Sequence, residues 1–126
     1  MLPEEGLAFA RGEVSLGRFV RGDVVVLHLP FSDLSQTKRR PALVLATLSG
    51  DNIILCQITS QAKSDEYSVA LDAADFESGG LSRPSRIRPN RLFTADSRIA
   101  LYATGRVRDS KLRETANAVI TILNQR

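Results

Sequence analysis

Arginine and lysine side chains give this chain its clearest chemical signature. Three consecutive cations, Lys38, Arg39 and Arg40, stand between the apolar runs at residues 24–29 and 42–45. Residues 83–113 carry eight arginines and one lysine against two aspartates, a local excess of +7 in a chain whose net charge is only +3. Guanidinium groups bind phosphate oxygens through paired hydrogen bonds. The pattern predicts contact with a polyanion, nucleic acid above all, and its alternative is a solvated charged surface.

The groups on which many enzymes depend are scarce. His28 is the single histidine and Cys56 the single cysteine, which argues against a Ser-His-Asp triad, a disulfide within the chain and a zinc site with two thiolates. We interpret Cys56 as a small core residue, and we expect His28 to point away from Leu27 and Leu29. No glycine-rich phosphate loop ends in lysine, and the carboxylates are scattered near loops. We therefore expect a function that needs neither metal nor cofactor.

Arginine combined with serine or threonine near strand ends suits one reaction, the cleavage of an RNA phosphodiester. The ribose 2′-hydroxyl can attack its own phosphate, so a protein needs only to orient the groups, move protons and stabilise charge on the pentacoordinate phosphate. Guanidinium groups stabilise such charge well. Arginine is a poor general base because its pKa lies above ~12, so its expected role is electrostatic or proton donation.

Short strands and one helix must position these groups. Aliphatic and β-branched runs bounded by turn residues predict strands at residues 24–27, 42–45, 53–58, 69–71, 85–93 and 99–103. The segments at 31–39 and 76–84 are predicted loops. Asp109 or Ser110 could cap a C-terminal helix. Its apolar stripe consists of Leu112, Ala116, Val119, Ile120 and Leu123. This pattern predicts a small, mainly β barrel with a helix packed across it.

Length and composition indicate one ordinary globular domain. The chain has 126 residues, of which 43% are hydrophobic and 25% charged. No apolar run approaches the ~20 residues that span a bilayer, and the start of the chain does not resemble a secretory signal. We therefore expect a cytoplasmic protein with no membrane partner. Residues 1–18 lack a clear pattern, so we expect a loosely ordered extension followed by a domain over residues 19–126.

The order of several motifs resembles a known family. RGDVVVLHLPFSDL is followed by KRRPALVLA, by a strand that ends in CQITSQ, by SRIRPNRLFTADSRI, and by a helix after GRV. Each motif alone is common, but this order and spacing are similar to the PemK/MazF toxins of bacterial type II toxin–antitoxin systems. The resemblance covers roughly residues 19–123.

This resemblance implies a compact SH3-like barrel of the CcdB/PemK type with a C-terminal α-helix, working as a homodimer. It implies metal-independent cleavage of single-stranded RNA, usually mRNA. The expected partners are a cognate antitoxin protein that blocks the RNA groove, and operator DNA bound together with that antitoxin.

The family's functional residues fall on definite positions of this sequence. The essential arginine of the Arg-Pro motif falls on Arg40, and the essential hydroxyl of the Ile-Thr motif falls on Thr59. The resemblance also implies that the loop at residues 32–39 gates and contacts RNA. The expected RNA contacts are Ser35, Gln36, Thr37, Lys38, Arg39, Ser60, Gln61, Arg86 and Arg88.

Alternatives stay open at this point. Arg40 could pair with a carboxylate such as Asp33, Thr59 could merely cap a strand end, and the triple cation leaves Arg39 as the fallback catalytic group. Arg86 and Arg88 could belong to a solvated face or a dimer surface. A protein of this fold could also act without catalysis, by binding DNA gyrase or as an operator-DNA-binding co-repressor. The extension before residue 19 is longer than the family usually has.

Overall fold

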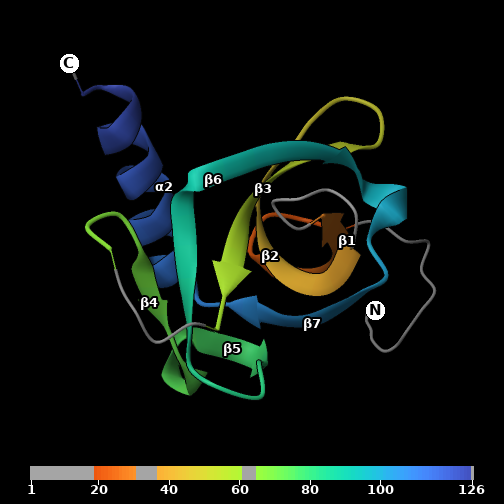
Figure 1. The fold of residues 1–126 in the computed structure, drawn as a ribbon, viewed down its shortest axis with the longest axis horizontal. Helices are drawn as coiled ribbons and strands as arrows, with labels where there is room; N and C mark the ends of the chain where they lie inside the picture. Colours follow the sequence, from red (N-terminus) through yellow and green to blue (C-terminus); the bar gives the residue numbers. More distant parts are fainter. Residues whose placement is uncertain (1–18, 31–36, 61–64, 126) are drawn as a thin grey trace.

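The computed structural model describes residues 19–30, 37–60 and 65–125 (Figure 1). Within these residues, seven strands, two 3₁₀ turns and one α-helix follow one another. They are β1 (Asp23–Pro30), β2 (Thr37–Thr47), β3 (Asn52–Thr59), β4 (Val69–Leu71), η1 (Ala73–Asp75), β5 (Phe76–Gly79), β6 (Ser85–Asp96), η2 (Ser97–Ile99), β7 (Tyr102–Val107) and α2 (Asp109–Leu123).

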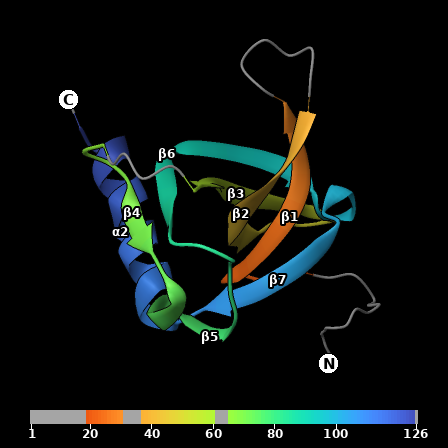
Figure 2. The same ribbon diagram turned by 60° about the horizontal axis from the view of Figure 1, so that its bottom comes forward.

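The strands form one antiparallel sheet that curls on itself. Its order is β4-β6-β3-β2-β1-β7-β5, so β4 and β5 are its two edges. The single turn η1 joins these two edge strands, which requires the sheet to curl until its edges approach each other. Helix α2 lies beside β4 and β6 in both views (Figures 1 and 2). The predicted fold class, a mainly β, SH3-like barrel with a C-terminal helix, is therefore confirmed, and the curled sheet forms a half-barrel.

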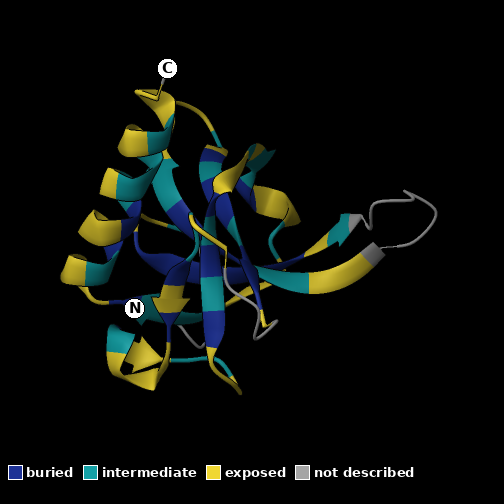
Figure 3. Cartoon of the chain, turned by 60° about the vertical axis from the view of Figure 1, so that its left-hand side comes forward, coloured by how far each residue is buried: buried dark blue, intermediate teal, exposed yellow. Residues whose placement is uncertain are grey.

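The apolar runs are continuous because the central strands are buried on both faces (Figure 3). On β1 and β2, Val24 and Leu43 belong to a core cluster that includes Leu112 of α2. Their neighbours Val25 and Val44 belong to a second cluster on the opposite face. Side chains alternate between the faces of a strand, so every residue of such a run meets a core.

Cys56 lies within the first cluster and is fully buried, as predicted. Burial raises the pKa of its thiol to about 12, and the thiolate is the reactive form of cysteine. We expect the native protein to resist alkylation by iodoacetamide at pH 8 and to react stoichiometrically once urea unfolds it. Mass spectrometry after timed quenching measures both rates, and rapid labelling of the folded chain would contradict this packing.

Strand β6 bends sharply at a bulge. Cys56 pairs with Leu92 but the next residue of β3, Gln57, pairs with Arg88, so residues 89–91 have no counterpart. Pro89 is buried in this bulge, where its missing N–H costs no ladder hydrogen bond. The bend is visible as the corner of β6 beside α2 (Figure 1). It turns residues 85–88 toward β4 and separates them from the rest of the strand.

The RGD motif at the start of β1 has a structural role. Gly22 adopts a left-handed φ of 96°, which permits a tight turn into the strand. Asp23 accepts a hydrogen bond from the Val20 amide at 2.9 Å and pairs with Arg106 at 2.8 Å. Burial raises the pKa of Asp23, and this hydrogen bond and Arg106 oppose the rise. Arg106, one of the cations of residues 83–113, therefore has a structural role.

Other cations of residues 83–113 also have structural partners. Arg98 pairs with Asp96 at 2.6 Å, and Lys111 pairs with Glu114 at 2.9 Å. Arg108 donates to the Ala74 carbonyl at 3.0 Å. Local net charge alone therefore overstated how many of these side chains a polyanion could contact.

Several predicted boundaries were wrong. Strand β2 begins at Thr37, so Lys38 and Arg39 lie in a strand rather than in the predicted loop at 31–39. The last strand is Tyr102–Val107 rather than 99–103, because residues 97–99 form η2. Asp96 caps that turn by accepting from the Arg98 amide at 2.9 Å. The predicted loop at 76–84 begins with β5, which pairs with β7.

The helix also differs from the prediction in two details. Its N-cap is Arg108, with no side-chain capping bond, while Asp109 lies in the first turn and pairs with Arg113. The apolar stripe is buried only toward its start, at Leu112. Ile120 and Leu123 are 53% and 71% exposed.

Within the described ranges no helix is long and apolar enough to cross a bilayer. The predicted extension at residues 1–18 lies outside the described residues, so that boundary stays a prediction.

Candidate functional site

Strands β2 and β3 separate where the sequence places the candidate chemistry. Their pairing extends to Ala42 opposite Gln57. Beyond that pair, β2 continues along β1 as far as Thr37, and β3 continues along β6. Arg40 lies two residues beyond the last β2–β3 pair on one branch, and Thr59 lies two residues beyond it on the other. The two residues therefore hold equivalent positions on either side of a fork in the sheet.

Strand alternation places these residues on one face. Ala42 belongs to the second core cluster, and Arg40 shares its parity on β2. On β3, Thr59 has the parity of Gln57, which lies directly opposite Ala42. On this face of the sheet, the apolar side chains of the second cluster are therefore followed by polar side chains.

Two arginines of β6 extend that polar face. Arg86 is the partner of Thr59, and Arg88 is the partner of Gln57. Residues directly opposite each other on antiparallel strands present their side chains to the same face. The face therefore combines three guanidinium groups, an amide and a hydroxyl, and Thr59 is only 7% exposed.

The segment before β4 holds both β6 arginines in place. Arg86 donates from Nε to the Ser68 hydroxyl at 2.6 Å and from Nη2 to the Ser68 carbonyl at 3.4 Å. Arg88 donates from Nη2 to Asp65 Oδ2 at 2.8 Å. These contacts bridge residues that are 18 to 23 positions apart in the sequence.

Asp65 is itself fixed by a short turn. Its Oδ1 accepts the backbone amides of Tyr67 at 2.9 Å and Ser68 at 2.8 Å. The Tyr67 amide contributes most to lowering the pKa of Asp65, and Ser68, Arg88 and Arg86 lower it further. The carboxylate therefore stays ionised at neutral pH and remains a partner for Arg88.

One donor on this face has no partner among the described residues. Arg88 Nε is buried and makes no hydrogen bond, although the side chain as a whole is 19% exposed. A buried donor without a partner is costly and is rare in native structures. Asp65 holds the other end of the guanidinium group, so Arg88 cannot turn to satisfy this atom without breaking its ion pair.

Residues 20–123 match the family model of the PemK-like, MazF-like toxins of type II toxin–antitoxin systems. The chain belongs to this family. A search of curated proteins found no match.

Solved structures of MazF proteins share the fold. A MazF crystal structure from Deinococcus radiodurans aligns with a TM-score of 0.68 at 23% identity, over 86% of this chain and 98% of that one. A MazE–MazF structure from the same organism aligns at 0.66 and 24%, over 85% and 97%. The Mycobacterium tuberculosis toxin MazF-mt6 aligns at 0.64 and 20%, over 82% and 98%. The family's curled sheet and C-terminal helix are therefore present here.

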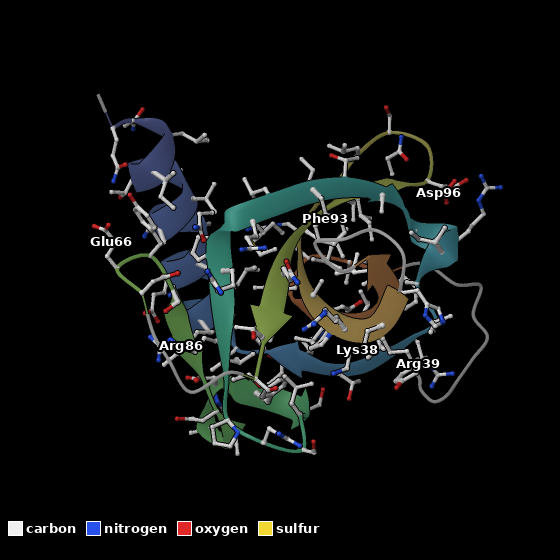
Figure 4. All side chains as sticks on the ribbon, in the orientation of Figure 1. Lys38, Arg39, Glu66, Arg86, Phe93 and Asp96 are labelled. Atoms are coloured by element: carbon white, nitrogen blue, oxygen red, sulfur yellow. The ribbon has the colours of Figure 1, made fainter. Side chains whose placement is uncertain are left out.

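The three cations predicted from the family motif divide between the two faces of β2. Lys38 has the parity of Arg40, whereas Arg39 alternates to the other face, opposite the exposed His28 of β1. Lys38 and Arg39 lie by the β1–β2 strands and Arg86 lies beside β4 (Figure 4). The register thus distinguishes Arg40 from the fallback Arg39 in position.

The remaining predicted contacts are placed unevenly. Ser60 is exposed directly after β3, and Thr37 is the first residue of β2. Ser35, Gln36 and Gln61 lie outside the described residues, as does Asp33, the alternative partner considered for Arg40.

Sequence reasoning missed three residues of this face, Gln57, Asp65 and Ser68. Gln57 had a visible signal, a polar residue within the apolar run IILCQI. Asp65 and Ser68 form a D-x-x-S turn signature, but their contacts with β6 depend on strand register. In the described part of this toxin, no group of three His, Cys, Asp or Glu side chains could hold a metal ion.

Proposed function

We propose that this PemK/MazF-family toxin is an endoribonuclease that cleaves single-stranded RNA, with mRNA as its cellular target. The observation that supports the proposal most is the fork between β2 and β3, with Arg40 and Thr59 at equivalent positions on one face. Arg86 and Arg88 extend this face on β6. Guanidinium and hydroxyl donors on one surface suit a phosphodiester that gains charge as it reacts.

The proposed reaction uses the substrate's own nucleophile. The ribose 2′-hydroxyl loses its proton to water, and its oxygen forms a bond to phosphorus while the bond from phosphorus to the 5′-oxygen of the next nucleotide breaks. Arg40 stabilises the pentacoordinate phosphate, protonates the leaving oxygen and regains a proton from solvent, and Thr59 donates to a non-bridging oxygen. The products are a 2′,3′-cyclic phosphate and a 5′-hydroxyl, so selectivity for RNA over DNA follows from the 2′-hydroxyl.

The same proposal includes the partners of the chain. One structural relative is a MazE–MazF assembly, and another is an endoribonuclease from a mycobacterial species in complex with its cognate antitoxin, at 14% identity and a TM-score of 0.66. By analogy we propose a cytoplasmic homodimer that a cognate antitoxin inhibits, and that binds operator DNA together with it.

Product chemistry tests this reaction directly. Purified toxin is incubated with a labelled pool of single-stranded RNA in the presence of EDTA. We expect fragments with 5′-hydroxyl ends, which accept label from polynucleotide kinase without prior phosphatase treatment. Fragments with 5′-phosphates would contradict the proposed reaction, and growth arrest without any cleavage would favour a toxin that acts by binding DNA gyrase.

A further inference from the structure

We propose that Asp65 and Ser68 are positioning residues that hold Arg86 and Arg88 as a clamp for one backbone phosphate of the RNA. This inference rests on the proposed function, because it assumes that the face carrying Arg40 and Thr59 meets RNA. It adds a phosphate subsite beside the reacting phosphate, and it assigns a role to two residues of the segment before β4.

The geometry of the clamp comes from β6. Arg86 and Arg88 are two residues apart and share a face, which separates their Cβ atoms by roughly 7 Å. Ser68 occupies two of the five N–H groups of Arg86, and Asp65 occupies one of Arg88. The occupied groups fix each guanidinium plane, and the remaining η hydrogens stay available for a ligand.

The charge of the clamp matches a phosphodiester. Two guanidinium groups face one carboxylate, Asp65, so the cluster keeps one net positive charge. A phosphodiester carries one negative charge and has two non-bridging oxygens, which can accept from both arginines. Asp65 neutralises only one of the two arginines, whereas Arg98 and Asp96 elsewhere in residues 83–113 form a neutral ion pair.

The orphaned Nε of Arg88 supports the proposal, because the side chain is held in place with one buried donor unsatisfied. A guanidinium group that served only to satisfy hydrogen bonds would not leave a buried N–H without a partner. The unsatisfied donor belongs to a side chain whose Nη2 donates to Asp65 at 2.8 Å. Unsatisfied groups of this kind call for an explanation, and a phosphate bound beside Arg88 is the one that this proposal gives.

The chain offers a matched pair of variants for the test. Asp65→Asn removes the charge that holds Arg88 but retains an oxygen that can accept the Tyr67 and Ser68 amides, so the turn is preserved. Glu66→Gln makes the same charge change at the next residue, which is exposed and lies beside β4 (Figure 4). Comparing the two separates positioning of Arg88 from the change in net charge.

Binding is measured by fluorescence anisotropy of the full-length chain with a 2′-O-methyl RNA, which cannot be cleaved through its 2′-oxygen. We expect Asp65→Asn to bind about three- to tenfold more weakly than Glu66→Gln, the cost of immobilising one side chain on binding. The salt dependence of binding should stay the same for Asp65→Asn, because Arg88 keeps its charge. It should fall by about 0.7 in log–log slope for Arg88→Ala, which removes one phosphate contact from a single strand.

Two results would overturn the clamp: equal affinities of Asp65→Asn and Glu66→Gln, or an unchanged salt slope for Arg88→Ala. Arg88→Lys provides a second variant, since it keeps the charge but loses the forked donor geometry. It should weaken binding without changing the slope. If the wild-type chain bound this RNA but did not cleave unmodified RNA, the proposed function would fail and the clamp would stand. If it cleaved RNA while either overturning result held, only the clamp would fail.

Discussion

Replacing Arg40 with alanine should lower the turnover of RNA cleavage by ~10²–10³, the usual loss when one transition-state donor is removed. Arg40 lies at the fork between β2 and β3, on the face that also carries Thr59. The phosphate gains its additional negative charge only during the reaction, so we expect kcat to fall far more than KM rises. Single-turnover kinetics with saturating enzyme separate the chemical step from binding.

Arg39→Ala is the matched control, because it removes the same charge one residue away. The β1–β2 register places Arg39 opposite His28 rather than on the face of Arg40. We expect this variant to weaken RNA binding and to reduce its salt dependence while kcat stays near the wild-type value. Circular dichroism and a thermal melt check that both variants are folded. If Arg39→Ala lost turnover while Arg40→Ala kept it, the catalytic assignment would move to Arg39.

Replacing Gly79 with alanine should destabilise the fold by about 2–6 kcal/mol, the sum of a conformational and a steric cost. Gly79 has a left-handed φ of 64°, which costs a residue with a side chain about 1–3 kcal/mol. It also pairs with Gly105 across β5 and β7. A Cβ at Gly79 would lie 2.3 Å from the Thr104 carbonyl oxygen and 2.6 Å from Gly105 Cα. Both contacts are to backbone, so the strands themselves must move apart, at a further cost of about 1–3 kcal/mol.

Gly50→Ala isolates the conformational part of this effect. Gly50 also has a left-handed φ, 73°, but a Cβ there would meet nothing within 4 Å. We expect a loss of only about 1 kcal/mol, the lower end of the cost of this conformation. Urea unfolding with a constant m-value measures both losses. Equal midpoints for the two variants would show that the close approach of β5 and β7 is not a constraint on the fold.

The sequence predicted the central strands well because both faces of each strand are buried. The runs VVVL, ALVL and IILC meet a core on each face, so continuous hydrophobicity marked them without any periodicity. The last strand was misplaced because Ile99 and Leu101 read as core residues yet are 52% and 43% exposed. There the Asp96 side chain caps η2 and so ends β6. This local hydrogen bond determines the backbone conformation even though the side chains that follow are apolar.

The candidate site was predictable only in part. Motif order assigned Arg40, Thr59, Arg86 and Arg88, and these assignments stay predictions until the variants are tested. The contacts of Asp65 and Ser68 with β6 could not be read from the chain, since they depend on the β4–β6 register and on the bulge at Pro89. The sequence likewise placed Gly79 in a loop and Gly105 at a strand end. Their pairing could not be predicted, because a close approach of two backbones leaves no hydrophobic pattern.

The most direct test removes one oxygen atom, the attacking 2′-oxygen, from one RNA substrate. The main cleavage site is first mapped by sequencing the 5′ ends that purified toxin produces in EDTA. That RNA is then synthesised with a single 2′-deoxyribose immediately 5′ of the cut. We predict that cleavage at this bond disappears while binding is retained, because the attacking oxygen has been removed. Continued cleavage of the deoxy substrate at the same bond would contradict the proposed reaction.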